Sequence, residues 1–314
     1  MRKRPLGKTG LAPSELALGT WSLSGDANGP VEPDEAEKTI AAALDMGITL
    51  FDTADAYGAG SMEQMLGKVV PKSDEVTIVT KIGIDRNTEP PRRRFDAEYV
   101  REAVARSQKR LKRDVLDVVM LHHPSEEVFL KGEASVLMKD LKKEGLFKHW
   151  GVCAGHADIA RAAIDQGAEV VSLPYNLLHV SDLNKVSGDV MVERPGVLLH
   201  SVLAYGLLTG IWREEREFDS SDHRSRRWSK HEIVERARHV DLLKFLVRGD
   251  VLTMRGAALR FALANHVGSS VIVGPKSVSQ LKELVREAGA GPRYLSDDDV
   301  KEVYKVLERA GVSL

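Results

Sequence analysis

The sequence predicts an α/β protein built as a (β/α)8 TIM barrel, and three features of the chain lead to this fold class. Short runs rich in β-branched residues alternate with amphipathic stretches that have helical spacing. Most of the strand-like runs are apolar throughout, which is typical of parallel strands covered on both faces. No break in composition divides the 314 residues, so we expect a single barrel domain over residues 1–314.

The predicted strands and helices follow one another along the whole chain. The strands are Ser14–Trp21, Ile48–Asp55, Val76–Gly83, Asp117–Pro124, Phe147–Ala154, Val170–Asn176, Gly196–Leu203 and Ser269–Pro275. The helical stretches between them are Glu35–Met46, Met62–Val69, Ala97–Leu111, Ala134–Lys143, Asp158–Asp165, a weak one near Asp182–Val190, and Met254–Ala264. The helix Val278–Ala288 follows the last strand and completes the repeat.

Three segments lie outside this repeat. Arg4–Leu11 has hairpin turn chemistry, and we expect it to close the bottom of the barrel. Tyr205–Lys230, which we call the excursion, is long and charged. We expect it to be a mobile cover that orders over bound cofactor, with a plain disordered linker as the alternative; a helical stretch, Glu232–Val247, follows it. Ser296–Arg309 is predicted as an added C-terminal helix, with Ser296 as its N-cap and aspartates in its first turn.

Composition narrows the partners and the compartment. A net charge of -1 gives no general reason to expect nucleic acid or an anionic membrane as a partner. No long apolar run follows the basic residues at the start of the sequence, so we expect neither a secretory signal nor a membrane helix. The single cysteine, Cys153, excludes an intrachain disulfide and favours a cytoplasmic protein. The sequence does not specify an oligomeric state.

Polar residues at the ends of three neighbouring strands are the candidate catalytic groups: Asp52, Tyr57, Lys81 and His122. Active sites of such barrels collect at the carboxyl ends of the strands. Taken singly, an aspartate there is usually a turn acceptor and a histidine usually a core residue. Lys81 lies inside an apolar strand, where a lysine is rarely buried unless it is paired, and Asp52 is the natural partner.

Together the four residues predict carbonyl reduction. Lys81 is expected to stabilise the phenolate of Tyr57 and to bring its pKa from about 10 towards neutrality. Asp52 would hold the ammonium, and His122 would orient a substrate carbonyl. Tyr57 would then donate its proton to the developing alkoxide, as reduction of an aldehyde or ketone to an alcohol requires.

At these residues the sequence resembles the aldo-keto reductase family. The resemblance rests on Phe51–Gly58, Thr80-Lys81 and Asp117–Pro124, and continues in Arg4–Leu11, Leu18–Trp21, Ser201–Gly210 and Gly274–Ser277. It implies a (β/α)8 barrel that binds NADPH in extended form, with no Rossmann domain and no metal. It also implies that Asp52, Tyr57, Lys81 and His122 are the catalytic tetrad.

The expected cofactor is NADP(H), with NAD(H) as the alternative. Backbone amides of the segment Ser201–Gly206 can bind a pyrophosphate, and Lys276 with Ser277 can bind a 2′-phosphate. No Gly-x-Gly-x-x-Gly follows a strand in the context of a Rossmann domain. The full predicted cofactor set is Gly19, Thr20, Trp21, Asp52, Cys153, Ser172, Tyr175, Ser201, Leu203, Gly206, Lys276, Ser277 and Gln280.

Four of these positions carry a qualification. Cys153 and Ser172 stand where the family commonly has Ser and Gln to hold the nicotinamide carboxamide, which implies fewer contacts there. Gln280 stands where an arginine is frequent. Tyr175 resembles the aromatic residue that stacks on the nicotinamide, but an ordinary core tyrosine explains it equally well.

Other activities stay open at this stage. A Schiff-base lyase would use Lys81 as its nucleophile, and a non-catalytic, cofactor-sensing subunit would keep the fold without fast turnover. Metal-dependent hydrolysis is disfavoured because His122 and His123 are adjacent and point to opposite faces of a strand. The partner is expected to be a small-molecule carbonyl or alcohol, selected by Trp21, His123, Trp150 and the excursion.

Overall fold

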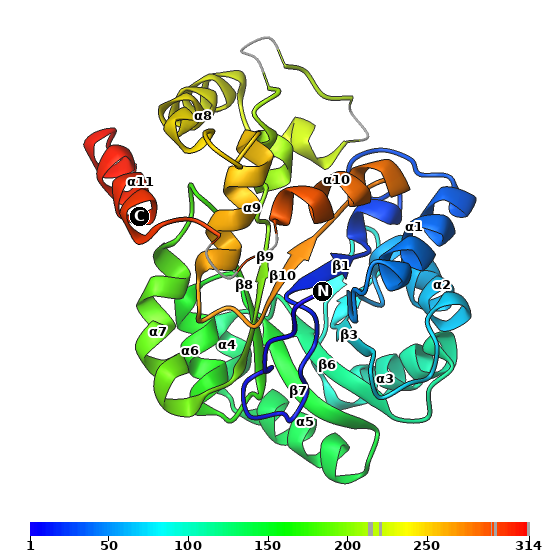
Figure 1. Cartoon of the computed structure of the whole chain (residues 1–314). Coiled ribbons are helices and arrows are strands. Elements are labelled where there is room, and N and C mark those ends of the chain that lie inside the picture. The colour runs from blue at the N-terminus through cyan, green and yellow to red at the C-terminus, as the bar shows by residue number, and fades with distance from the viewer. Residues whose placement is uncertain (213–215, 220–221, 290, 292–293, 313–314) are drawn as a thin grey trace.

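Eight parallel strands close into a barrel that is ringed by helices (Figure 1). The computed structural model describes residues 1–212, 216–219, 222–289, 291 and 294–312. Around the barrel the strands are β1 (Leu16–Gly19), β10 (Ser270–Val273), β9 (Gly196–His200), β8 (Val170–Pro174), β7 (Phe147–Cys153), β6 (Leu116–His122), β3 (Thr77–Ile82) and β2 (Leu50–Asp52). The predicted fold class is confirmed, and each predicted run overlaps one barrel strand, although β6 begins one residue before its run.

The helices that follow the strands form the outer layer. They are α1 (Pro33–Asp45), α2 (Ser61–Val69), α3 (Ala97–Leu111), α4 (Glu126–Leu130), α5 (Glu133–Lys143), α6 (Ala157–Asp165), α7 (Ser181–Glu193), α9 (Met254–Ala264) and α10 (Val278–Ala288). The weak prediction near Asp182–Val190 is a complete helix, α7, because it buries Leu183, Val186 and Val190. The sequence did not predict α4 or the small antiparallel pair of β4 (Ile84–Asp85) and β5 (Arg92–Arg93).

The N-terminal segment closes the bottom of the barrel, as expected. The turn is held by a hydrogen bond from Leu6 N to Leu11 O at 2.8 Å. The Leu6 side chain is fully buried in a cluster with inward residues of the strands, among them Ala17, Leu50 and Val79. Gly7 has a φ of 57°, and a Cβ there would lie 2.3 Å from Gly196 N, so a larger residue cannot take its place.

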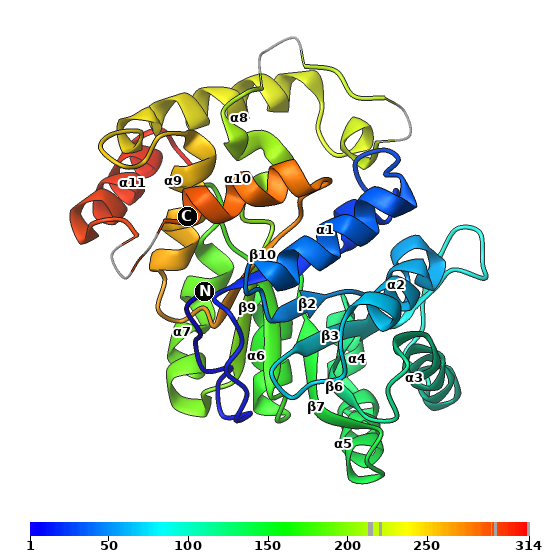
Figure 2. The ribbon, with the colours of Figure 1, turned by 45° about the vertical axis from the view of Figure 1, so that its right-hand side comes forward.

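The excursion and α8 (Lys230–Leu242) lie on the side of the barrel that carries α9 and α10 (Figure 2). Residues 213–215 and 220–221 of the excursion lie outside the described residues. The rest includes the short 3-10 helices η3 (Ala204–Thr209) and η4 (His223–Arg226). A hydrogen bond from His223 N to Ala27 O at 3.2 Å attaches the excursion to the loop between β1 and α1.

The predicted stretch Glu232–Val247 is not one helix. α8 begins after the N-cap Ser229, whose hydroxyl and the Glu232 carboxylate form a capping box, and a separate turn, η5 (Lys244–Leu246), follows it. The added C-terminal helix is confirmed as α11 (Asp297–Arg309), with Ser296 as N-cap accepting from Asp299 N. None of the described helices has the length and apolar character needed to cross a membrane.

The strand register brings the ends of the strands to one rim. Gly19 lies opposite Asp52, and Asp52 opposite Val79, two residues before Lys81. On the next strands His122 lies opposite Cys153, and Cys153 opposite Ser172. Because parallel strands end together, the predicted site residues of six strands are neighbours at the carboxyl end of the barrel.

Candidate active site

A buried ion pair forms the base of the site. Lys81 Nζ lies 2.6 Å from Asp52 Oδ1 and donates a second hydrogen bond to Thr53 O at 3.1 Å. The side chains of Lys81 and Asp52 are only 3% and 7% exposed. A pair this deeply buried is costly to place there unless its hydrogen bonds are made, and here two of them are.

Tyr57 and His122 complete the group. The Lys81 ammonium lies 5.2 Å from the centroid of the Tyr57 ring. The rings of Tyr57 and His122 meet edge to face, with centroids 5.7 Å apart and an interplanar angle of 81°. Residues from β2, β3, β6 and the turn after β2 are thus brought together in the arrangement that the sequence analysis proposed.

The charge on Lys81 is fixed by its surroundings. Burial lowers the pKa of Lys81, but Asp52 and Tyr57 raise it by more in combination, so the pKa lies above its ordinary value. Burial raises the pKa of Asp52, and the ammonium of Lys81 lowers it. The pair therefore presents an ammonium to Tyr57, and the second carboxylate oxygen of Asp52 has no partner among the described groups.

The expectation that the pKa of Tyr57 falls towards neutrality is wrong for this structure. Burial raises the pKa of Tyr57 above 10, and the opposing effect of Lys81 does not compensate for it. The phenol therefore keeps its proton at neutral pH, which suits a donor. An alkoxide is a stronger base than a phenolate, so transfer from the phenol to a developing alkoxide is still favourable, with Lys81 stabilising the phenolate.

The histidines at the rim are neutral. Burial, then the charge of Lys81, lowers the pKa of His122 well below 6.5, and its Nδ1 has no partner among the described groups. Burial likewise lowers the pKa of His123 to about 4. A neutral His122 can donate one hydrogen bond to a carbonyl oxygen without giving up its proton, which leaves Tyr57 as the acid.

The turn that carries Tyr57 is held by hydrogen bonds with Asp26 and Arg86. Gly58 has a φ of 55°, and its N–H donates to the Asp26 carboxylate at 2.6 Å. Arg86 pairs with the same carboxylate at 2.6 Å and donates to Ala56 O at 2.8 Å. Sequence reasoning missed Asp26 and Arg86, because both lie in loops with no periodicity or motif to single them out.

An acidic group lies behind the tetrad. Glu63 is fully buried, accepts a hydrogen bond from Thr80 at 2.6 Å and pairs with Arg110 at 3.1 Å. Asp55 is buried beside it, and burial, then the charge of Glu63, raises the pKa of Asp55 to about 7. Thr80 precedes Lys81, so this network anchors the end of β3 from outside the barrel.

The first strand supports the site in two ways. The Thr20 hydroxyl donates to Asp52 O at 3.1 Å and lies 2.9 Å from the Thr53 hydroxyl, so it braces the backbone of β2. Trp21 is half-buried at the rim, with its ring centroid 6.4 Å from that of Tyr57 and 6.3 Å from that of Tyr205. Gly19 is tightly packed, since a Cβ there would lie 2.8 Å from Ile272.

Cys153 and Ser172 lie side by side at the ends of β7 and β8. Cys153 is buried, and its sulfur lies 3.8 Å from His123 Nε2. The Ser172 hydroxyl is buried and has no partner among the described groups. An unpartnered buried hydroxyl beside the tetrad is an observation that fits a missing polar partner, such as the carboxamide of a nicotinamide.

Two aromatic residues of the predicted set lie in the core instead of at the rim. Tyr175 is 2% exposed and stacks on Phe261 of α9 with centroids 5.4 Å apart, which is the core position that the sequence left open. Trp150 is also 2% exposed and packs in the main hydrophobic core, which is a structural position and not one that selects a substrate. Tyr205, which the sequence analysis did not assign, is the aromatic ring beside Trp21.

The segment after β9 has an unusual backbone. Positive φ angles occur at Ser201 (57°), Ala204 (45°), Tyr205 (58°) and Gly206 (96°), and strained backbone of this kind is common at binding sites. The Gly206 and Ala204 amides, however, donate within the segment, to Leu203 O and Ser201 O. The expectation that these two amides are free to bind a pyrophosphate is therefore corrected.

The start of α10 is also engaged with its surroundings. Ser277 is the N-cap, and its hydroxyl accepts from Gln280 N at 3.3 Å. The Gln280 side chain accepts from Lys276 N at 2.9 Å, and Lys276 Nζ donates to Asn28 O at 2.8 Å. A Cβ on Gly274 would lie 3.1 Å from the Ser22 hydroxyl, so Gly274 packs closely against Ser22.

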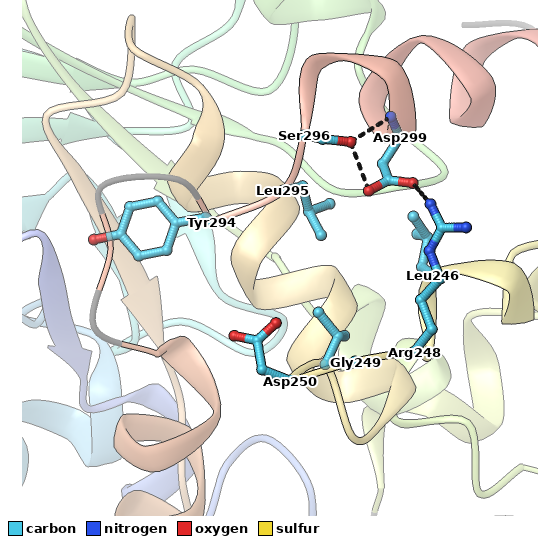
Figure 3. A pocket seen from close by; sticks show the side chains of 9 residues that line it. Leu246, Arg248, Gly249, Asp250, Tyr294, Leu295, Ser296 and Asp299 are labelled. Atoms are coloured by element: carbon cyan, nitrogen blue, oxygen red, sulfur yellow. Dashed lines mark hydrogen bonds and ion pairs between the residues drawn. The ribbon is translucent and has the colours of Figure 1, made fainter.

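A cavity of about 380 Å³ lies elsewhere, beside α11 (Figure 3). Its charged residues are already paired, since Arg248 lies 2.5 Å from Asp299 and Asp250 lies 2.5 Å from Arg260. It contains no member of the tetrad, and we assign it no catalytic role. Within the described part of the chain, no three His, Cys, Asp or Glu side chains lie where they could hold a metal ion.

Comparison with known proteins identifies the family. A sequence profile described as the Aldo/keto reductase family matches residues 15–308. The chain is 30% identical to an aldo-keto reductase of Bacillus subtilis (strain 168), over 98% of this chain and 94% of that protein. It is 28% identical to the NADH-specific methylglyoxal reductase of Escherichia coli (strain K12), over 98% and 100% of the two chains.

A plant enzyme and a solved structure agree with this placement. The chain is 32% identical to L-galactose dehydrogenase of Arabidopsis thaliana, over 90% of this chain and 86% of that protein. The structure of a glycerol dehydrogenase from Gluconobacter oxydans matches with a TM-score of 0.84 and 23% identity, over 99% and 97% of the two chains. The structural likeness supports the barrel fold, and the profile match covers nearly the whole chain. The protein belongs to the aldo/keto reductase family.

Proposed function

We propose that this protein reduces aldehyde or ketone carbonyls of small molecules to alcohols, with a nicotinamide dinucleotide as hydride donor and Tyr57 as proton donor. The observation that carries the proposal is the buried Lys81–Asp52 pair beneath the rings of Tyr57 and His122. We assign the activity to one barrel domain over residues 1–314. The lone cysteine, Cys153, favours a reducing compartment, and we place the activity in the cytoplasm.

Each member of the tetrad has a defined task in this proposal. The Tyr57 hydroxyl gives its proton to the oxygen of the substrate as that oxygen gains charge. The Lys81 ammonium stabilises the resulting phenolate, and Asp52 holds the ammonium at 2.6 Å. Neutral His122 donates a hydrogen bond to the same oxygen and orients it towards Tyr57.

The residues present fit a nicotinamide cofactor, which would supply the hydride when bound. The unpartnered Ser172 hydroxyl and the small side chain of Cys153 would hold the carboxamide end. Trp21 and Tyr205 would contact the rings of the cofactor. The segment from Ser201 through Leu203 would contact its pyrophosphate. Lys276 and Ser277 would bind a 2′-phosphate. We propose NADP(H) as the cofactor, with NAD(H) also accepted; the relative from Escherichia coli bears the name of an NADH-specific enzyme.

The Schiff-base alternative is weakened by the state of Lys81. A lysine nucleophile must be a neutral amine, and such lysines have a lowered pKa. Here Asp52 and Tyr57 together raise the pKa of Lys81 and keep it charged. The cofactor-sensing alternative keeps the same site and differs only in turnover, so the experiment below decides it.

A turnover assay tests the proposal. Purified protein would be incubated with NADPH or NADH and a panel of carbonyls that includes methylglyoxal and glyceraldehyde, and the absorbance of the reduced nicotinamide would be followed. We expect steady oxidation with at least one carbonyl, and none above background with the Tyr57→Phe variant. If the parent and Tyr57→Phe proteins oxidise neither cofactor faster than buffer does, the reductase proposal is wrong.

A further inference from the structure

A carboxylate of the protein occupies the N-terminus of α10. Glu35 Oε1 accepts a hydrogen bond from Val278 N, the first amide of that helix, at 2.9 Å. Glu35 itself lies in the first turn of α1, so its charge is close to the positive ends of two helices. Exposed amides and the positive end of a helix make such a place favourable for an anion, and here a side chain takes it.

The cation beside this carboxylate is held by the same loops. Lys276 directly precedes the N-cap of α10, and its Nζ donates to Asn28 O, in the loop that leads to α1. Lys276 N donates to Gln280 Oε1. A phosphate arriving here would therefore meet the ammonium of Lys276, the amides at the start of α10 and the negative charge of Glu35, with an uncharged amide at position 280.

We propose that Glu35 determines the choice between NADPH and NADH, an inference that rests on the proposed nicotinamide-dependent function. Its carboxylate competes with the 2′-phosphate for the start of α10 and narrows the preference for NADPH that Lys276 provides. The 2′-phosphate carries close to two negative charges at neutral pH, whereas NADH has an uncharged hydroxyl in its place. Repulsion by Glu35 therefore weakens the binding of NADPH and hardly changes the binding of NADH.

A substitution can remove the charge of Glu35 and keep its hydrogen bond to Val278 N. A glutamine at position 35 keeps an oxygen that can accept from Val278 N, so the contact between α1 and α10 survives without the negative charge. Glu37 is the matched control, because it lies on the same helix and pairs instead with Lys68 at 2.7 Å, away from α10. Neither Glu37 nor Lys68 belongs to the proposed cofactor site.

The test measures binding rather than turnover. Dissociation constants of NADP⁺ and NAD⁺ would be determined from quenching of tryptophan fluorescence for the parent, Glu35→Gln, Glu37→Gln and Lys276→Met proteins. We expect Glu35→Gln to tighten NADP⁺ binding about tenfold at low salt and to change NAD⁺ binding by less than about twofold. Raising the salt concentration should shrink the gain, because part of it is exposed electrostatics. Glu37→Gln should match the parent, and Lys276→Met should weaken NADP⁺ alone.

The outcomes separate this inference from the function on which it rests. If both nucleotides bind the parent but Glu35→Gln leaves the ratio of the two dissociation constants unchanged, the role of Glu35 is refuted and the reductase proposal stands. If Glu35→Gln tightens both nucleotides equally, the charge does not discriminate and the inference fails as well. If neither nucleotide binds the folded parent protein, the inference and the proposed function fall together.

Discussion

Replacing Lys81 by methionine tests both the stability and the chemistry of the site. The change removes one partner of an ion pair whose atoms lie 2.6 Å apart and leaves the Asp52 carboxylate buried without its cation. Breaking a buried pair in this way typically costs about 3–5 kcal/mol of the free energy of unfolding. The exposed pair of Lys68 and Glu37 has a similar distance, 2.7 Å, with side chains 63% and 37% exposed, and Lys68→Met should cost at most about 1 kcal/mol.

The free energy of unfolding that Lys81→Met loses should depend on pH. Lys81 lowers the pKa of Asp52, so its removal leaves burial to raise that pKa further. A carboxyl group whose pKa is higher in the folded than in the unfolded protein contributes stability at low pH and loses it as the pH rises. Lys81→Met should therefore be more destabilised relative to the parent at pH 8 than at pH 5.

The double variant Asp52→Asn/Lys81→Met separates folding from catalysis. It removes both charges, so most of the lost stability should return, while the support for the Tyr57 phenolate should not. Urea-induced unfolding followed by circular dichroism gives the free energies, and oxidation of the reduced cofactor gives the turnover. A folded Lys81→Met protein with parental turnover would refute the proposed mechanism. A cost no larger than that of Lys68→Met would refute the account of the buried pair.

Three further predictions use other parts of the site. Tyr57→Phe should lower turnover by roughly 10²- to 10⁴-fold and leave the dissociation constant of the cofactor unchanged; parental turnover would mean that another group donates the proton. Arg86→Met should lower kcat roughly tenfold without weakening the cofactor, because it releases Ala56 O and Asp26 beside Tyr57, whereas Arg94→Met on the same hairpin should not. The pKa of Asp55 is raised to about 7, so its stabilising effect is complete below about pH 4 and is lost as the pH rises through 7. Asp55→Asn should therefore raise the free energy of unfolding at pH 8, by up to about 4 kcal/mol, and by less at pH 5; equal effects at the two pH values would contradict the assignment.

The sequence predicts the barrel well because most strand residues are buried on both faces, so that the strands have recognisable apolar runs. The helices α3, α9 and α10 begin and end at the predicted residues, since caps and apolar spacing mark both of their ends. Segments whose structure depends on distant contacts were not predicted. α4 has only five residues, and β4 with β5 consists of two residues in each strand, which is too short for any periodicity.

The candidate site, like the fold, was predictable from the sequence only in part. Residue types and strand ends were sufficient to select Asp52, Tyr57, Lys81 and His122, because their chemistry requires them to lie together. The direction of the pKa shift of Tyr57 was not predictable, because it depends on the balance between burial and the charge of Lys81. Tyr175 was ambiguous because a strand end does not reveal which face its ring takes, and its ring packs against Phe261.

The loop from Trp21 to the start of α1 contacts three parts of the proposed site. Asp26 accepts from Gly58 N beside the proton donor, Ala27 O accepts from His223 of the excursion, and Asn28 O accepts from Lys276. Glu35, at the start of the helix that follows, accepts from Val278 of α10. The proposed proton donor, the excursion and the proposed phosphate end of the cofactor site are therefore attached to one short stretch of chain. Because these contacts share a single stretch of backbone, we expect a substitution in this loop to disturb both the Tyr57 turn, through Asp26, and the position of Lys276, through Asn28.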